Sequence, residues 1–237
     1  MQRFRGRIYA SDHAIQESEL TRDGRHRVPA DDHSWHVLSV EGNDQVTACL
    51  RYTDSARARG FDSLSVRHAA LTHIPAWGGH FRNAVETEME RARQEHLRFG
   101  EVGGWAVAEN HRWTLEPLRI ILATYGLLEL LGGCAGVATA TSRHHSSTIL
   151  RRLGLRALEW DGVALPPYYD PQYRCDMEVL SFDSRYPNPK YRGWVEELAS
   201  CLSTAPVVCA SNPAYHLRET FLGFETPLAE PALVRVA

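Results

Sequence analysis

The most constraining feature of the sequence is a continuous apolar stretch, Leu118 to Ala140, which is long enough to cross a lipid bilayer. Two observations argue against a membrane span. Arg119 and Glu129 lie inside the stretch, where a charge is costly in lipid. Gly132-Gly133 also divides the stretch into a helix-length piece and a strand-length piece. The pattern therefore predicts a buried helix, with Pro117 in its first turn, that leads into a buried strand at Ala135–Thr141.

Helix and strand patterns alternate along the rest of the chain. Trp35–Val40 and Gln45–Tyr52 are rich in strand-forming residues and flank a turn sequence, which predicts an antiparallel hairpin. A short helix is expected around His13–Thr21. The other expected helices are Phe81–Leu97, Ser146–Leu153 and Tyr191–Leu202, and the other expected strands are Glu101–Ala108, Tyr173–Phe182 and Ala205–Ala210. This order predicts one mixed α/β sandwich domain over residues 1–237, with its core at about 31–210 and a C-terminal arm at 211–237.

Composition and charge narrow the function classes. The chain has 237 residues, 43% of them hydrophobic, so it can bury a core without metal or disulfide support. A formal charge of −3 disfavours a general nucleic-acid binder. The five cysteines are widely spaced and form no CxxC pair, and no apolar segment follows the basic N-terminus, so we expect a cytoplasmic protein without a secretory signal. Two sets of histidines are candidate metal ligands, His144 and His145 with His111, or His33 with His36, but no Cys or Asp accompanies either set with zinc spacing, and no metal is expected.

Three segments, taken in order, resemble the GNAT acyltransferase superfamily, and more closely its branch of N-acyl amino acid synthases and acyl-homoserine-lactone synthases. The first is Asp32–Leu38 together with Thr47–Tyr52. The second is Glu101–Val107, similar to the Glu-x-Ser-Arg-x-x-Val strand of the branch, with Arg112 after it. The third is Ser146–Leu155, which looks like the helix and Leu-Gly-Phe ending of the fold. The resemblance covers roughly Asp31 to Asp183.

The resemblance implies a single-domain, three-layer α/β/α sandwich whose mixed, mostly antiparallel sheet is splayed at its centre. It implies N-acyl transfer from an acyl thioester, acyl carrier protein or acyl-CoA, to the amine of an amino acid or similar small molecule, with no tightly bound cofactor. One alternative is an acyl-homoserine-lactone synthase that uses S-adenosylmethionine. Another is a non-catalytic protein that binds an acylated ligand, because Gly103-Gly104 stands where the branch has Ser-Arg and no phosphate-loop signature follows.

The same resemblance suggests roles for individual residues. Glu101 would bind the ammonium or take its proton, unless it is only a solvated strand-edge residue. Arg51 would pair with the acceptor's carboxylate or with Glu101, or form a structural salt bridge. Residues suggested for the acyl donor are Gly103, Gly104, Trp105, Ala106, Val107, Arg112, Ser146 and Ser147, and those for the acceptor are Ser34, His36 and Trp105.

Several of these residues also have simpler interpretations. Ser146 and Ser147 resemble helix N-cap residues, and His36 is typical of a core hydrogen bond. Arg112 can contact a phosphate near the start of the Pro117 helix or belong to the surface. Trp105 is expected on the same strand face as Glu101 and Gly103, because side chains alternate with a period of two. The two glycines themselves predict a bulge or a close backbone approach.

Overall fold

The computed structural model describes residues 1–42, 44–55, 57–209 and 232–236. The chain divides into two compact units, each assembled from separate stretches of sequence. The first unit comprises Met1–Thr53, Gly104–Leu130 and Gly193–Ala237, and the second comprises Asp54–Gly103 and Leu131–Arg192. Most of the expected C-terminal arm, residues 211–231 and 237, lies outside the described residues.

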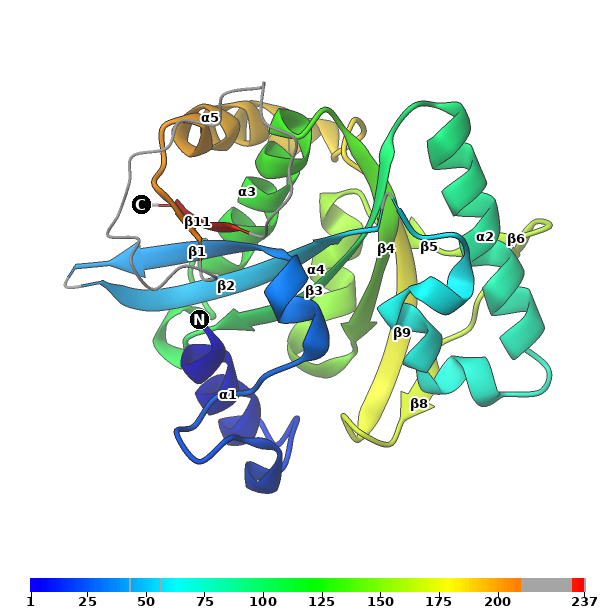
Figure 1. Ribbon diagram of the computed structural model, residues 1–237, viewed down its shortest axis with the longest axis horizontal. Helices are drawn as coiled ribbons and strands as arrows, with labels where there is room; N and C mark the ends of the chain where they lie inside the picture. The colour runs from blue at the N-terminus through cyan, green and yellow to red at the C-terminus, as the bar shows by residue number, and fades with distance from the viewer. Residues whose placement is uncertain (43, 56, 210–231, 237) are drawn as a thin grey trace. The chain divides into compact units, whose positions relative to one another are not determined.

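The first unit contains a sheet built around the expected hairpin. Strands β1 (Trp35–Glu41) and β2 (Gln45–Asp54) are antiparallel neighbours, as Figure 1 shows, so this prediction is confirmed. Strand β11 (Ala232–Val236) lies parallel to β1, and β10 (Val207–Cys209) pairs antiparallel with β11. The described part of the expected arm therefore contributes a strand to the sheet.

Three helices accompany these strands: α1 (Gln2–Ser11), α3 (Glu116–Leu130) and α5, which begins at Arg192 and ends at Ser203. Helix α3 confirms the interpretation of the apolar stretch, since most of its side chains are buried. It approaches α5 closely at Gly126, where a Cβ would lie 2.9 Å from the backbone nitrogen of Ala199. None of the helices in the described ranges is long and apolar enough to span a bilayer.

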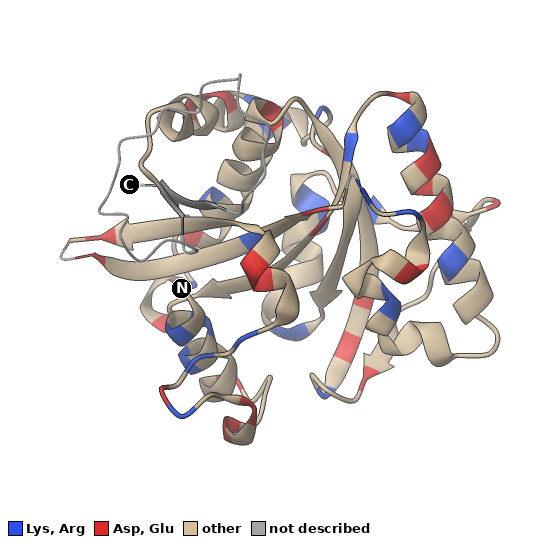
Figure 2. Cartoon of the chain, in the orientation of Figure 1, with Lys and Arg blue, Asp and Glu red and all other residues tan. Residues whose placement is uncertain are grey.

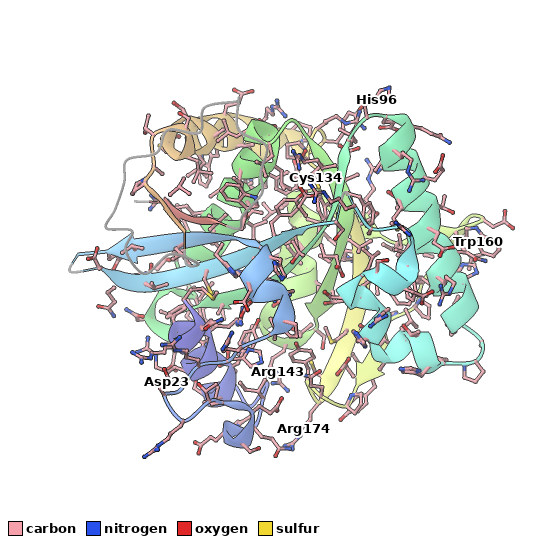
Figure 3. The ribbon with its side chains drawn as sticks, viewed as in Figure 1. Asp23, His96, Cys134, Arg143, Trp160 and Arg174 are labelled. Carbon is pink, nitrogen blue, oxygen red and sulfur yellow. The ribbon has the colours of Figure 1, made fainter. Side chains whose placement is uncertain are left out.

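The second unit is organised around β4 (Cys134–Thr141), the strand that follows the apolar helix. Cys134, labelled in Figure 3, begins the strand, and its backbone N–H donates to Ser184 Oγ at 2.9 Å. Strand β4 runs parallel to β3 (Arg98–Val107) and antiparallel to β9 (Cys175–Asp183), beside which it lies in Figure 1. Strand β3 continues from the second unit into the first. Both units therefore contain a mixed, mostly antiparallel arrangement of strands.

Helix α2 (Gly78–Gln94) packs one face into the core of the second unit. Phe81, Val85, Met89 and Ala92 are buried at spacings of three and four, as the sequence predicted. Figure 2 shows basic and acidic residues recurring along this helix, which together with the buried apolar residues makes it amphipathic. Helix α4 (Ser146–Leu153) has the predicted bounds.

The shortest elements were not predicted. Strands β5 (Arg156–Ala157) and β8 (Tyr168–Asp170) each pair with β9, and β6 (Glu159–Trp160) pairs with β7 (Val163–Ala164). The helix expected around His13–Thr21 is wrong, because the chain forms α1 before it and only a 3₁₀ turn within it. The 3₁₀ helices are η1 (Glu17–Glu19), η2 (Pro29–His33), η3 (Phe61–Ser63), η4 (Ser65–His68), η5 (Ala70–His73), η6 (Glu109–His111), η7 (Arg143–His145) and η8 (Pro189–Tyr191).

Candidate active site

Glu101 lies on β3 in the second unit, where it is the register partner of Val137. Its carboxylate accepts two backbone hydrogen bonds at the start of η4: Ser65 N–H donates to Oε2 at 2.9 Å and Val66 N–H donates to Oε1 at 2.6 Å. The side chain is half-buried. Because a carboxylate oxygen can accept more than one hydrogen bond, both oxygens retain capacity for an ammonium group or a proton. Glu101 thus holds η4 in place.

The β3–β4 ladder ends one residue beyond Glu101. In the second unit the parallel register extends from Arg98↔Cys134 to Val102↔Ala138. On its other side, β4 stays paired with β9 as far as Thr141↔Met177. The described pairing of the two parallel strands therefore stops before either strand ends, next to the carboxylate.

The start of α4 corrects one expectation. Ser146 and Ser147 were expected to cap this helix, but they are its first two residues, and the N-cap position belongs to His145. His144 and His145 both adopt left-handed backbone conformations, with φ of 53° and 59°. Ser146 Oγ donates to the carbonyl of Arg143 at 3.0 Å, and Ser147 is buried. The guanidinium of Arg143, labelled in Figure 3, donates in turn to the carbonyl of Tyr173 at 3.0 Å, which fixes this turn.

In the first unit, Arg51 belongs to a buried charge network with Arg5 and Asp31 that no sequence pattern indicated. Arg5 on α1 donates twice to Asp31, at 2.9 Å to Oδ1 and 2.6 Å to Oδ2, and both side chains are almost fully buried. Arg51 donates to Asp31 Oδ1 at 3.2 Å. Burial alone would raise the pKa of Asp31, but the two guanidinium groups and the Val28 N–H hold that pKa well below its usual value. The network therefore remains ionised at neutral pH.

The network leaves one donor of Arg51 unused. Its Nε is buried and has no hydrogen-bond partner among the described residues, although the whole side chain is 15% exposed. A buried charged donor without an acceptor is costly, and such groups usually meet a ligand or an ordered water. Arg51 is therefore held in place by Asp31, and its buried Nε has no acceptor among the described residues.

Gly104 confirms the predicted close approach on β3. Its φ is +64°, and a Cβ there would lie 3.2 Å from a guanidinium nitrogen of Arg5 and 3.3 Å from Cβ of Arg51. The groups that approach this glycine within the first unit are thus the arginines of the network. Gly104, with its left-handed backbone, also interrupts the alternation of side chains along β3. The argument from alternation that placed Glu101 and Trp105 on one face of the strand therefore does not hold across this residue.

The residues after Gly104 lie mainly in the core of the first unit. Ala106 packs with Phe4, Ile8 and Cys49, and Val107 is also buried. The carbonyl of Trp105 accepts a hydrogen bond from Tyr9 Oη at 3.2 Å, while its indole Nε1 is buried without a partner in the described part of the chain. Burial raises the pKa of the Cys49 thiol to about 11, which keeps this small core side chain protonated.

Ser34 and His36 are buried and already hydrogen-bonded. Ser34 Oγ donates to the carbonyl of Ala30 at 2.5 Å and lies 2.7 Å from Thr53 Oγ1. His36 Nε2 lies 3.0 Å from the carbonyl of Asp31. These contacts give both residues a structural function beside the charge network, and His36 makes the core hydrogen bond that the simpler interpretation predicted.

Two buried histidines next to this network make stability depend on pH. Burial lowers the pKa of His36, and burial together with the charge of Arg5 lowers the pKa of His26. A histidine whose pKa is lower in the folded state takes up its proton first in the unfolded chain. The free energy of unfolding is therefore expected to fall as the pH decreases below about 6.5, by at most about 1.4 kcal/mol per pH unit for each histidine.

Urea denaturation of the wild type between pH 7.5 and pH 5.5 measures this slope. The variant His36→Gln should have a shallower slope, whereas His33→Gln, which changes an exposed histidine, should keep the slope of the wild type. Equal slopes in the wild type and His36→Gln would contradict the expected coupling.

Arg112 and the start of α3 are engaged within the first unit. Arg112 donates to Asp12 at 2.8 Å, which joins the loop after β3 to the end of α1. The first-turn amides of α3 also have partners: Glu116 N–H donates to Thr114 Oγ1, and the N–H groups of Leu118 and Arg119 donate to the carbonyl of Leu115. Pro117 has no N–H, and the Glu116 carboxyl is buried at this helix end. The helix start thus lacks free amides for a pyrophosphate.

In the part of the chain that the structure describes, no group of three or more His, Cys, Asp or Glu side chains is arranged to hold a metal ion.

Comparison with known proteins gives a likeness of fold. No protein-family model and no curated protein matches the sequence. The structure is similar to that of BjaI, a CoA-dependent acyl-homoserine lactone synthase, with SAM and isopentyl-CoA: the two are 13% identical, the match covers 84% of this chain and 80% of that chain, and the TM-score is 0.53. The same synthase with MTA matches at 14% identity with the same coverage and TM-score. FeeM, an N-acyl amino acid synthase from uncultured soil microbes, matches at 10% identity over 60% of this chain and 63% of that chain. Its TM-score is 0.38, below the value at which two structures share a fold. The chain therefore has a GNAT-like α/β fold with a mixed, mostly antiparallel sheet.

Proposed function

We propose that this protein is an N-acyltransferase that moves an acyl group from an acyl thioester, carried by acyl carrier protein or CoA, to the amine of an amino acid or similar small molecule. The observation that carries the proposal is the end of the β3–β4 ladder beside Glu101, in a fold shared with a synthase solved with an acyl-CoA. An extended pantetheine arm can hydrogen-bond to a strand edge in the way that an added strand does.

The reaction needs a neutral amine, a thioester carbonyl aligned with it, and donors for the developing oxyanion. In this proposal Glu101 accepts the proton of the ammonium, directly or through water, and backbone N–H groups beyond Val102 meet the thioester. The amine then attacks the carbonyl carbon, the carbon–sulfur bond breaks, and the thiol leaves with a proton. Arg51, which the resemblance assigns to the carboxylate of the acceptor, is held by Asp31 within the first unit.

The start of α3 bears on how the donor binds. The amides of Glu116, Leu118 and Arg119 in its first turn are occupied, and the Glu116 side chain is buried at the same helix end. We expect the donor to be held mainly through its pantetheine arm and acyl chain. Both CoA and carrier-protein donors share these parts, so both belong in the assay.

A thiol-release assay tests the function. Short- and long-chain acyl-CoA and acyl carrier protein donors are incubated with pooled amino acids or with S-adenosylmethionine. Thiol release that depends on an amino acid supports the proposal, whereas release of methylthioadenosine from S-adenosylmethionine supports the acyl-homoserine-lactone alternative. Absence of thiol release with every donor and acceptor contradicts both and favours the non-catalytic binding protein.

Glu101→Gln is expected to reduce kcat/KM by about 10²- to 10⁴-fold, because the amide cannot accept the proton. The matched control is Glu86→Gln. Glu86 also accepts a backbone hydrogen bond at the start of a 3₁₀ helix, from Phe61 N–H at 3.4 Å, so this change tests the structural contact without the proposed base. The assignment of Glu101 is wrong if both variants retain wild-type turnover, or if both lose it together.

A further inference from the structure

A hollow of about 670 Å³ in the second unit is lined by none of the residues assigned to the acyl donor or acceptor. Its walls come from the C-terminal turn of α4, the start of β5 and the segment from Arg185 to Arg192. The volume falls within the range of small-molecule sites, about 300–1,000 Å³. Among the described residues that line the hollow, none is acidic and four are arginines: Arg151, Arg156, Arg185 and Arg192.

The floor of this hollow is fixed by Asn188. Its backbone N–H donates to the carbonyl of Leu153 at 3.0 Å, and its side-chain amide donates to the carbonyl of Arg152 at 2.8 Å. Its side-chain oxygen accepts from Lys190 N–H at 3.0 Å. Gly154, with φ of +119°, permits this close approach, because a Cβ there would lie 2.9 Å from the nitrogen of Asn188. The hollow is therefore preformed.

The arginines differ in how far they are neutralised. Arg151 pairs with Glu178, and Arg185 pairs with Asp183 and Glu95. Arg156 is exposed and has no side-chain hydrogen bond or ion pair within the described ranges. Arg151 lies in the last turn of α4, where a cation offsets the partial negative charge of the C-terminal end of the helix. Arg156 belongs to β5, so this explanation does not apply to it. Arg156 thus supplies a guanidinium fork that suits a phosphate group.

Tyr186 adds an aromatic surface to the same hollow. Its side chain is 63% exposed, and the guanidinium carbon of Arg185 lies 5.1 Å from its ring centroid. An exposed ring beside arginines is suited to stacking against a flat heterocycle. We infer that this hollow binds a nucleoside diphosphate group, with the phosphates on the arginines and the base against Tyr186. This inference does not depend on the proposed acyltransferase activity.

Isothermal titration of the full chain with ADP, inorganic pyrophosphate and CoA tests the inference. ADP is expected to bind, and Arg156→Gln is expected to weaken that binding by about tenfold or more, since one charged contact is lost. Tyr186→Ala should weaken the binding of ADP while leaving the affinity for pyrophosphate nearly unchanged. Binding of both ADP and CoA would assign the site to the nucleotide end of a carrier molecule, whereas binding of ADP alone would assign it to a free nucleotide.

The matched control is Arg59→Gln, which removes an exposed arginine of the second unit outside the hollow. This variant should bind ADP as the wild type does. The inference is overturned if wild-type protein shows no heat with ADP at millimolar concentrations. It is equally overturned if Arg156→Gln and Arg59→Gln bind ADP with the same affinity.

Discussion

Replacing Asp31 with alanine is expected to lower the free energy of unfolding by about 3–5 kcal/mol, because it leaves buried guanidinium groups without their counterion. Arg5 is 1% exposed and makes two hydrogen bonds to this carboxylate, and Arg51 makes a third. Asp31 also accepts from the Val28 N–H at 3.3 Å, so alanine leaves a backbone donor unsatisfied as well. Urea denaturation at pH 7.5 measures the change.

The matched control for this substitution is Asp23→Ala. Asp23 also pairs with an arginine, Arg3, at 3.0 Å, but both side chains are exposed, and a solvent-screened pair contributes little. Its replacement should change stability far less. A third variant, Arg5→Met with Asp31→Leu, removes both charges and should recover part of the loss. Similar destabilisation by Asp31→Ala and Asp23→Ala would show that the buried network has no special contribution.

Gly136→Ala is expected to cost about 3 kcal/mol or more, because the added methyl group meets backbone atoms that cannot turn away. A Cβ at Gly136 would lie 1.9 Å from the carbonyl oxygen of Gly100 and 2.8 Å from Cζ of Phe182. Gly100 is the register partner of Gly136, so relief of the clash requires β3 and β4 to separate next to Glu101. We expect a lower Tm and loss of any acyl transfer.

Gly79→Ala is the control for this change. Gly79 lies in the first turn of α2, and a Cβ there has no atom within 4 Å. Alanine should leave the Tm unchanged or raise it, because glycine is the weaker helix former by roughly 0.5–1 kcal/mol. A Gly136→Ala protein as stable as Gly79→Ala would contradict the tight β3–β4 register.

The elements that could be predicted from sequence have strong local signals. The bounds of α4 follow from its apolar spacing and from Gly154, which ends the helix in a left-handed conformation. The apolar stretch predicted α3 and β4 because its two glycines, 132 and 133, separate the helix from the strand and both have positive φ. Strand β5 has only two residues and exists through its pairing with β9, so it carries no local pattern. Helix α1 was missed because its apolar residues are diluted by arginines.

The residues of the candidate site could be named from the sequence, but most of their contacts could not be predicted. Glu101, Arg51 and the two glycines were identified from a resemblance, but their partners are distant in sequence. Arg51 meets Asp31 across 20 positions, and Glu101 meets Val66 across 35. A buried ion pair leaves no periodic trace, although Phe4 and Ile8, one helical turn apart, could have indicated that α1 places Arg5 in the interior.

The interleaving of the two units has a consequence for how the chain folds during synthesis. The second unit is complete when Arg192 has been made, whereas the first unit begins at Met1 and needs residues from Gly193 onwards. At about 5–20 residues per second, the ribosome takes a few seconds to add residues 193–237. During this interval β1 has a hydrogen-bonding edge that β11 later covers. The stretch Met1–Thr53 is therefore made before any part of the second unit, yet the unit to which it belongs is completed after the second unit.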